Sequence, residues 1–399
     1  MGLTLTLRSK PDTTAGSSIP PSLFLGFAVA SIGGPLALAA IYLPGAADLR
    51  SAGLLTVLGS LVYACPLAVW VRYSKDIVSA GGLAAFVEAA AGRRLALVQA
   101  AVWTISYFLY LPYTVTDIVY EMLVVVFPGI EPWRWLLELT IPLGIVAIVL
   151  AGTIPALRIL FVSAVLQLLL LLAFGAVLIG HVGAPGRSFT HVPGTHDLFH
   201  DTAAIALLFV CGSLPLFLGA EAQGGSRTVR RTLVIAGSVV AAYALFAVFA
   251  FAAVDPSFRR GEIPAFDVAA AYSGRTLAVA VGLGAAVSVA GVIVAEYLAL
   301  SRLLFAVTGV PVRRLLAWIA VPFFAVDALS LVDPDAFDEN VLRPSLVALF
   351  LSQLIVFAVF PLYRKRRGTL TPVDVAIAGI AFAVMAFGLW RGIAAPVST

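Results

Sequence analysis

The sequence predicts an all-α protein that crosses a membrane about eleven times, and three observations lead to this prediction. With 61% hydrophobic residues, 12% charged residues and a mean hydropathy of +1.04, the 399 residues have too little polar surface for a water-soluble globule. The apolar residues form stretches long enough to cross a bilayer as helices. Two of these stretches are interrupted in the same way by small residues and proline.

Eleven apolar stretches are long enough to be membrane spans. In chain order they cover residues 22–44, 51–72, 95–127, 135–152, 155–180, 203–223, 232–254, 275–300, 314–331, 344–363 and 371–391. Residues 1–21 are polar and lack a small-residue cleavage site, so we expect a short cytoplasmic tail and no signal peptide. Because the number of spans is odd, the two termini should lie on opposite sides.

The distribution of Lys and Arg predicts the orientation, because cytoplasmic loops carry the excess of positive charge. With the N-terminus in the cytoplasm, 17 of the 25 Lys and Arg fall on the cytoplasmic side. The basic groups are short and adjoin spans, as Arg364-Lys365-Arg366-Arg367 does, so they indicate topology and no nucleic-acid binding. We therefore predict a multi-pass protein of the cell membrane.

The first and sixth spans are each broken by glycine, serine and proline. The breaks read Ser31-Ile32-Gly33-Gly34-Pro35 and Cys211-Gly212-Ser213-Leu214-Pro215. A break leaves backbone groups unpaired, which is tolerated at membrane depth only where the backbone is buried in protein or lines a watery cavity. Broken helices at corresponding positions of two halves indicate the binding site of a secondary transporter.

Five crossings separate the two breaks, so the halves should have opposite orientations. We expect a 5+5 inverted repeat in a transporter core of residues 22–363, with repeats at 22–180 and 203–363. The last span, 371–391, stands outside the repeat.

The two breaks suit a substrate that carries both a carboxylate and an ammonium. A broken helix offers free NH groups at a positive dipole end and free carbonyls at a negative one. The predicted substrate-binding residues at the breaks are Ser31, Gly33, Gly34, Cys211, Gly212 and Ser213. The glycines of the first break would admit the carboxylate, and carbonyls of the second would accept from the ammonium. The alternative is a pair of kinks that ease helix packing.

The third span carries a polar face. Its members, at three- and four-residue spacing, are Ser106, Tyr110, Tyr113, Asp117 and Tyr120. We assign Tyr110 to the substrate site. Asp117 lies roughly 10 Å further outward by helical rise, so it fits an outer vestibule with a coupling or gating role. A structural ion pair with an arginine is the alternative.

The second half contributes polar residues to spans 6 and 8. Ser288, near mid-depth of span 8, is a candidate to hold a cation or substrate, and its alternative is a bond to its own backbone. Glu221 and Glu296 lie toward the cytoplasmic side, as do Arg227 and Arg302. These charges predict either a coupling or gating ion pair, or a static structural pair.

All four histidines fall between spans 5 and 6, in a predicted outer loop. They are His181, His191, His196 and His200, and Asp197 and Asp201 stand beside the last two. A solvated loop and a divalent-metal site are both open readings, and we assign no metal site and no cofactor. The two cysteines lie in apolar segments, so no disulfide framework can be read.

Three sequence elements resemble amino acid permeases of the amino acid-polyamine-organocation (APC) superfamily. They are the run 79–94 (SAGGLAAFVEAAAGRR), Gly219-Ala220-Glu221 followed by Arg227, Arg230 and Arg231, and the run 300–306 (LSRLLFA). The resemblance covers roughly residues 22–310. It implies a transporter of amino acids or related amines.

The resemblance has two departures. The first break reads Ser31-Ile32-Gly33-Gly34-Pro35, whereas many members of the family carry a Gly-Ser-Gly type element at this place. Proton-coupled relatives can carry a lysine in span 5 in place of a sodium ion, and here Gln167 stands at that coupling position in a span without lysine. The sequence therefore predicts no lysine-based coupling.

The predicted function is secondary active transport of an amino acid or related amine across the cell membrane by alternating access. The predicted partners are this small-molecule substrate, the lipid bilayer and an unidentified coupling ion. A channel would favour rings of charges or filter loops. A membrane-embedded metal-dependent enzyme would need a nucleophile, metal or acid-base set inside the spans, so we expect no enzyme.

Overall fold

The structure is a computed structural model that describes residues 18–46, 50–182, 186–251, 254, 258 and 261–394. Within these residues it is helical, with one isolated parallel bridge between Ile19 and Ala222. Ten helices are long and apolar enough to cross a membrane, and a bent pair, Thr195–Leu208 with Val210–Glu221, makes an eleventh. The all-α prediction of about eleven spans is confirmed. Most of the predicted N-terminal tail, residues 1–17, lies outside the described residues.

The first repeat contains spans 1 to 5. Its elements are α1 (Pro21–Ala30), α2 (Pro35–Ala37), the π-helix η1 (Leu38–Tyr42), α3 (Leu43–Ala46), α4 (Ala52–Tyr73), α5 (Gly82–Ala91), α6 (Arg93–Thr116), the π-helix η2 (Asp117–Leu123), α7 (Val124–Val126), η3 (Pro128–Trp133), α8 (Arg134–Leu150) and α9 (Thr153–Val182). The short α10 (Arg187–Thr190) follows. Each predicted span of this repeat coincides with one of these helical segments.

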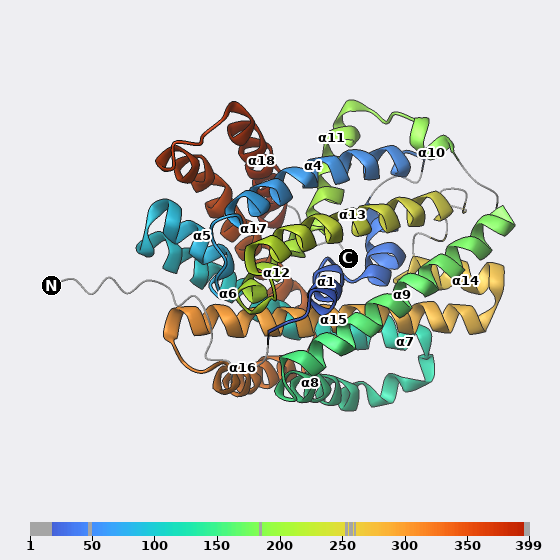
Figure 1. The fold of residues 1–399 in the computed structure, drawn as a ribbon. Coiled ribbons are helices and arrows are strands. Elements are labelled where there is room, and N and C mark those ends of the chain that lie inside the picture. The colour runs from blue at the N-terminus through green and yellow to red at the C-terminus, as the bar shows by residue number, and fades with distance from the viewer. Residues whose placement is uncertain are drawn as a thin grey trace.

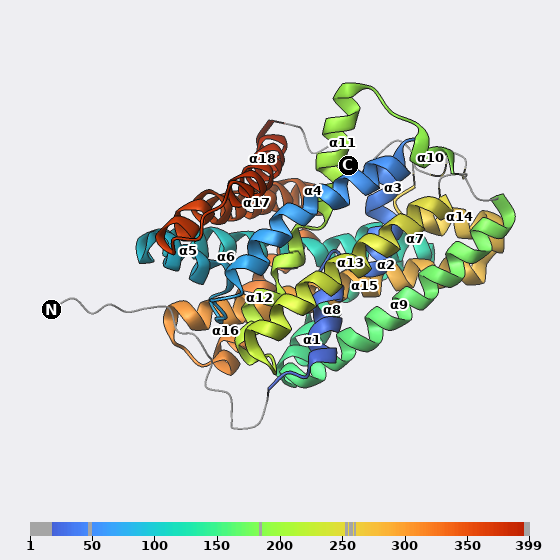
Figure 2. The same ribbon diagram turned by 45° about the horizontal axis from the view of Figure 1, so that its top comes forward.

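The second repeat repeats this pattern. Its elements are α11 (Thr195–Leu208), η4 (Val210–Ser213), α12 (Pro215–Leu218), η5 (Gly219–Glu221), α13 (Gly225–Phe251), α14 (Pro264–Ser273), α15 (Arg275–Thr308), α16 (Val312–Asp327), η7 (Ala328–Leu331) and α17 (Pro334–Arg366). The eleventh span, α18 (Pro372–Ala394), packs against α17 and α4, and Figure 2 shows it beside α17.

The repeat is visible in two matching helices. Both α5 and α14 have ten residues and end at a glycine with positive φ, Gly92 at 92° and Gly274 at 82°, before a long span begins. Only glycine adopts this backbone readily, so the turn between short and long helix is encoded twice. The two short helices lie at opposite ends of the molecule (Figure 1), as inverted repeats require.

The first span lies in the centre of the bundle. In its apolar window 83% of the residues are buried, against 28% for Pro128–Leu150, so span 1 is surrounded by protein and span 4 is peripheral. α1 packs against α9, α13 and α15, and Figure 1 shows it among them. The broken backbone is therefore shielded from lipid, as its unpaired groups require.

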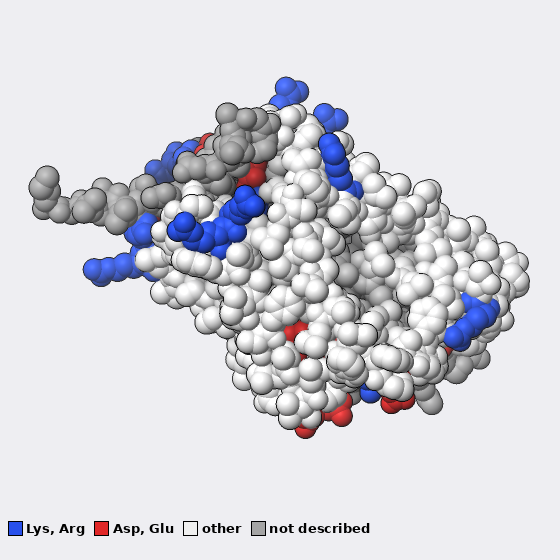
Figure 3. Space-filling model, turned by 90° about the horizontal axis from the view of Figure 1, so that it is seen from below, with Lys and Arg blue, Asp and Glu red and all other residues white. Residues whose placement is uncertain are grey.

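The outer surface suits contact with lipid. On α9, exposed apolar side chains such as Val162, Leu166 and Leu169 are 55 to 60% accessible. The face in Figure 3 has broad areas without charge. In water such a surface would be an aggregation site, whereas in a bilayer it is the expected exterior.

Candidate functional site

The first break contains two glycines whose φ angles are positive. α1 ends at Ala30, and Gly33 and Gly34 have φ of 68° and 67° before α2 begins at Pro35. A side chain at either glycine would be strained. The amides of Gly33 and Gly34 bond to no other described residue, whereas the Gly34 carbonyl accepts from the Leu38 amide. Two NH groups are thus available at the break.

The next two amides are held by the side chains of Gln167 and Ser288. Gln167 Oε1 accepts from Leu36 N at 3.4 Å, and Ser288 Oγ accepts from Ala37 N at 3.2 Å. The bonds connect α2 to α9 and α15. The structure thus brings both predicted residues to the first break, where they cap the second half of the broken helix.

The two glycines of this break differ in their surroundings. Gly34 is buried, and a Cβ built on it would lie 2.8 Å from the Ser288 carbonyl oxygen, so the backbone of α15 fills that space. Gly33 is half-buried, and its Cβ would meet nothing closer than the Leu208 carbonyl and Leu38 at 3.7 Å. Gly33 therefore offers the more open backbone. Ser31 is buried and donates to the Ala28 carbonyl at 3.0 Å, so its side chain is already engaged.

The second break lies next to the first. α11 ends at Leu208, and the bent pair turns by 43° there. A Cβ built on Gly212 would overlap the Tyr63 hydroxyl and lie 3.5 Å from Ile32 Cγ1. The hydroxyl of Ser213 accepts from Gln353 Nε2 at 3.1 Å. The two interruptions therefore meet, which the prediction of one central site requires.

Half-buried side chains mark the space beside the breaks. Cys211 and Tyr110 lie within the bundle and yet keep part of their surface accessible. Tyr107 lies near Cys211, and its buried hydroxyl has no hydrogen-bond partner among the described residues. The Tyr107 ring stacks on Trp103 at 4.1 Å between centroids. This region is aromatic, and the Tyr110 ring lies 5.5 Å from that of Tyr113.

Glu296 departs from its predicted surroundings. We expected it near the cytoplasmic charges, but its carboxylate acts on Tyr107, Tyr110 and Cys211. It is fully buried, and neither carboxylate oxygen has a hydrogen-bond partner among the described residues. A buried unpaired carboxylate is costly, so a cation or proton must neutralise it.

An ion pair forms between Glu221 and Arg302. Arg302 Nε and Nη2 donate to the two Glu221 oxygens at 2.9 and 3.2 Å, and Nη2 also donates to Thr153 Oγ1 at 2.5 Å. Both charged residues are buried. Beside them Ile19 N donates to Glu221 O at 2.8 Å, and Gln223 N donates to Ile19 O at 3.0 Å. Spans 1, 5, 6 and 8 are thus tied together at one end.

Asp117 begins the π-helix η2, a local form that often marks functional positions. It is half-buried, and the charged groups that act on it are the carboxylates of Glu121, Glu262 and Asp338. Its own charge acts on Tyr42 and Tyr113. The predicted structural pair with an arginine is not present among the described residues within 4 Å. Asp117, Glu121, Glu262 and Asp338 thus form an acidic region next to Tyr42 and Tyr113.

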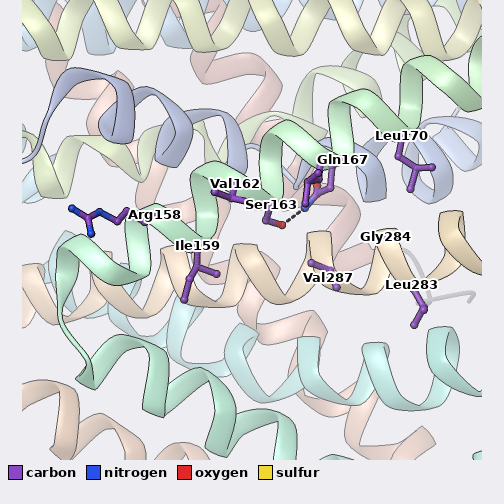
Figure 4. A pocket seen from close by; sticks show the side chains of 10 residues that line it. Arg158, Ile159, Val162, Ser163, Gln167, Leu170, Leu283, Gly284 and Val287 are labelled. Atoms are coloured by element: carbon purple, nitrogen blue, oxygen red, sulfur yellow. Dashed lines mark hydrogen bonds between the residues drawn. The ribbon is translucent and has the colours of Figure 1, made fainter.

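A groove of about 570 Å³ runs between α9 and α15. Its lining residues are Arg158, Ile159, Val162, Ser163, Leu166, Gln167, Leu170, Leu283, Gly284 and Val287. Ile159, Leu166 and Val287 face the exterior with 48 to 60% of their surface exposed, so the groove faces lipid. Gln167 lines the groove and donates from Nε2 to Ser163 Oγ at 2.7 Å (Figure 4), while its Oε1 accepts from the Leu36 amide next to the first break.

Sequence reasoning missed Gln353 and Tyr63, which contact the second break. A single amide inside an apolar span was a usable signal for Gln353, whereas Tyr63 is found only from packing. The histidines also differ from the prediction, because α11 begins at Thr195 and includes His196 and His200. Each of these two bonds to the aspartate next to it. No group of three or more metal-type ligands occurs in the described part of the chain.

Solved structures resemble this chain over nearly its whole length. MhsT in complex with L-phenylalanine matches with a TM-score of 0.64 and 15% identity, covering 92% of this chain and 98% of its own. A Na+-coupled sialic acid symporter matches with 0.61 and 15%, covering 96% and 92%. The manganese transporter of Eremococcus coleocola matches with 0.59 and 13%, covering 99% and 92%.

These likenesses show the fold, which is the LeuT type with a 5+5 inverted repeat. No family model matches the sequence, and no curated protein is similar to it. At 13 to 15% identity the neighbours, which handle an amino acid, a sugar acid and a metal ion, do not carry a substrate over to this chain.

Proposed function

We propose that the protein is a secondary active transporter that moves an amino acid or related amine across the cell membrane by alternating access. The observation that carries the proposal is the meeting of two broken helices, with two unpaired amides on one side and a buried carboxylate near the other. An inverted repeat with a site between its halves supports the same conclusion.

The first break would bind the carboxylate of the substrate. The amides of Gly33 and Gly34 lie ahead of α2, and the following amides of Leu36 and Ala37 are already bonded to protein side chains. Two adjacent NH groups at a helix start favour an anionic oxygen. Of the two glycines, Gly33 is the less crowded, so we expect the carboxylate to approach there.

Glu296 and the tyrosines would receive the ammonium. Glu296 supplies a negative charge that nothing in the described part of the chain pairs, and Tyr107 and Tyr110 lie within its electrostatic range. Aromatic faces also attract cations. The acidic region around Asp117 would raise the local concentration of a cationic group on its way to the site.

Access would alternate through opening of the inner ion pair. The Glu221–Arg302 pair and the Ile19 bridge join spans at one end, and Tyr110 and Asp117 are half-buried. We infer an arrangement closed to the cytoplasm. The coupling ion is left open between sodium and a proton. Uptake with and without an imposed gradient of each ion identifies it.

Counterflow in proteoliposomes tests the proposal. Vesicles loaded with one unlabelled amino acid or amine should accumulate its labelled form transiently and saturably, with or without imposed proton and sodium gradients. Empty vesicles and vesicles loaded with a sugar serve as controls. Linear, unsaturable flux would indicate a channel, and conversion into a new compound would indicate an enzyme. Either result would contradict the proposal.

A further inference from the structure

Two buried carboxylates lie away from the broken helices. Glu138 on α8 and Asp327 at the end of α16 are both fully buried. The two helices pack together and lie side by side in Figure 1. They are the fourth and ninth spans, which correspond to each other in the inverted repeat. The end of α16 lies beside Glu138, because Ser330, three residues after Asp327, bonds to the Glu138 carboxylate.

The pair is only partly hydrogen-bonded. The hydroxyls of Thr116 and Ser330 both lie 2.7 Å from Glu138 Oε1. Ser330 Oγ is also 2.7 Å from the Asp327 carbonyl oxygen, and its single proton can serve only one of the two acceptors. Glu138 Oε2 and both Asp327 carboxylate oxygens have no hydrogen-bond partner among the described residues.

No basic residue neutralises the pair. Within the described residues, no Lys or Arg nitrogen lies within 4 Å of either carboxylate. The nearby Arg134 lies over the Tyr120 ring at 4.8 Å and within 3.7 Å of Glu131. Burying one uncompensated carboxylate costs several kcal/mol or more, and two together cost more still.

We propose that Glu138 and Asp327 bind one hard metal cation, with the hydroxyl oxygens of Thr116 and Ser330 as further ligands. All the available atoms are oxygens, which hard cations such as Na+ and Ca2+ prefer over softer metals. The three unpartnered carboxylate oxygens supply both the charge and the open coordination. This site is separate from the central one and stands whether or not the central site binds an amine.

The cation would fix the third span against the fourth and ninth. Thr116 precedes Asp117, where α6 changes into the π-helix η2, so a ligand at Thr116 would hold the backbone that carries the acidic region. Occupancy of this site would thereby set the position of Asp117 without contact with the substrate.

Thermal unfolding of the full-length protein in detergent tests the site. At constant pH and ionic strength, Na+ and Ca2+ would each be titrated against N-methylglucamine, with tryptophan fluorescence as the readout. One of the two should raise Tm saturably, by about 3 °C at a hundredfold excess over its Kd. Asp327→Asn should lose this rise, and Ser330→Ala should increase the half-saturating concentration about tenfold. The exposed acid Asp335 provides the matched control, Asp335→Asn, which should respond as the wild type.

An equal rise in wild type and Asp327→Asn would overturn the proposal, because the cation would then bind elsewhere. A Tm that responds to pH and to neither cation would also overturn it, since protons alone would neutralise the pair. Should Asp327→Asn not fold, labelling of wild-type protein with dicyclohexylcarbodiimide provides the second measurement. Saturating cation should protect Glu138 and Asp327 from modification, and unprotected labelling would refute the site.

Discussion

At the scale of the residue, the central site depends on positions where a single methyl group cannot be added. Gly34 packs on the Ser288 backbone, and Gly212 packs on the Tyr63 hydroxyl. Gly33 has room, but its positive φ makes any side chain cost roughly 1 to 2 kcal/mol. The three glycines are thus needed for different reasons: Gly33 for its backbone conformation, Gly212 for close contact, and Gly34 for both.

We predict that Gly34→Ala and Gly212→Ala each lower uptake by about tenfold or more, because they displace α15 or Tyr63 from the break. Membrane abundance should stay close to that of the wild type. Gly144→Ala is the matched control, since a Cβ there meets nothing within 4 Å. Normal uptake by both variants would show that the breaks are packing kinks. Uptake of a labelled substrate and surface biotinylation are the measurements.

At the scale of the element, two connections decide how the broken helices are held. Gln167 and Ser288 hold α2 through its backbone, so this half-helix belongs mechanically to α9 and α15. At the inner end, the ion pair of Glu221 and Arg302 holds the segment after α12 against α15. One connection positions α2, and the other is the pair to which we assign a gating role.

Gln167→Ala should lower Tm and raise KM, since the buried Leu36 amide loses its acceptor at a cost of about 1 to 3 kcal/mol. The ratio of uptake with and without a proton gradient should not change, because no lysine-type coupling is expected at this position. Leu166→Ala, at the lipid-facing neighbour, serves as the control. A ratio that falls to one in Gln167→Ala would show that this residue takes part in coupling. KM and the uptake ratio follow from proteoliposome uptake, and Tm follows from thermal unfolding in detergent.

The double variant Glu221→Gln with Arg302→Gln should open the inner end. Removing both charges avoids the penalty of about 3 to 5 kcal/mol that a lone buried partner would incur. In a Cys65→Ser background, Cys211 should then react faster with an impermeant maleimide added from the cytoplasmic side. Arg313→Gln, an exposed residue that the topology places at the same end, should label as the wild type. Unchanged labelling of the double variant would argue against a gating role.

At the scale of the whole molecule, eleven spans require the chain to end on the side opposite to its start. We predict that an N-terminal tag is protected and a C-terminal tag is accessible to protease added outside intact cells. The loop charges give the direction of this asymmetry. Finding both tags inside would mean that one of the eleven helices, such as the short Val312–Leu331, does not cross.

The sequence was sufficient for the number of spans and the pairing of the breaks, because length, hydropathy and glycine-proline clusters are local signals. It also supplied Gln167 and Ser288 as residues of interest, although capping of α2 became visible only in three dimensions. Glu296 shows the limit of what the sequence can predict. The sequence placed it toward the cytoplasmic charges, but which neighbours it faces depends on the rotation of α15 against α6, which no local pattern records. The same holds for Glu138 and Asp327, which are far apart in sequence and meet only through packing.

The bridge between Ile19 and Ala222 uses backbone atoms alone, with donors at Ile19 and Gln223. The two bridge bonds need no particular side chain, so they tolerate a change of residue type, and only proline at a donor position abolishes one of them. The Gln223 side chain adds bonds to Ser18 beside them. Related sequences could therefore drift to little identity here and still fasten the start of the first span to the end of the sixth. A comparison of sequences would then see a variable segment at a place where the architecture is constant.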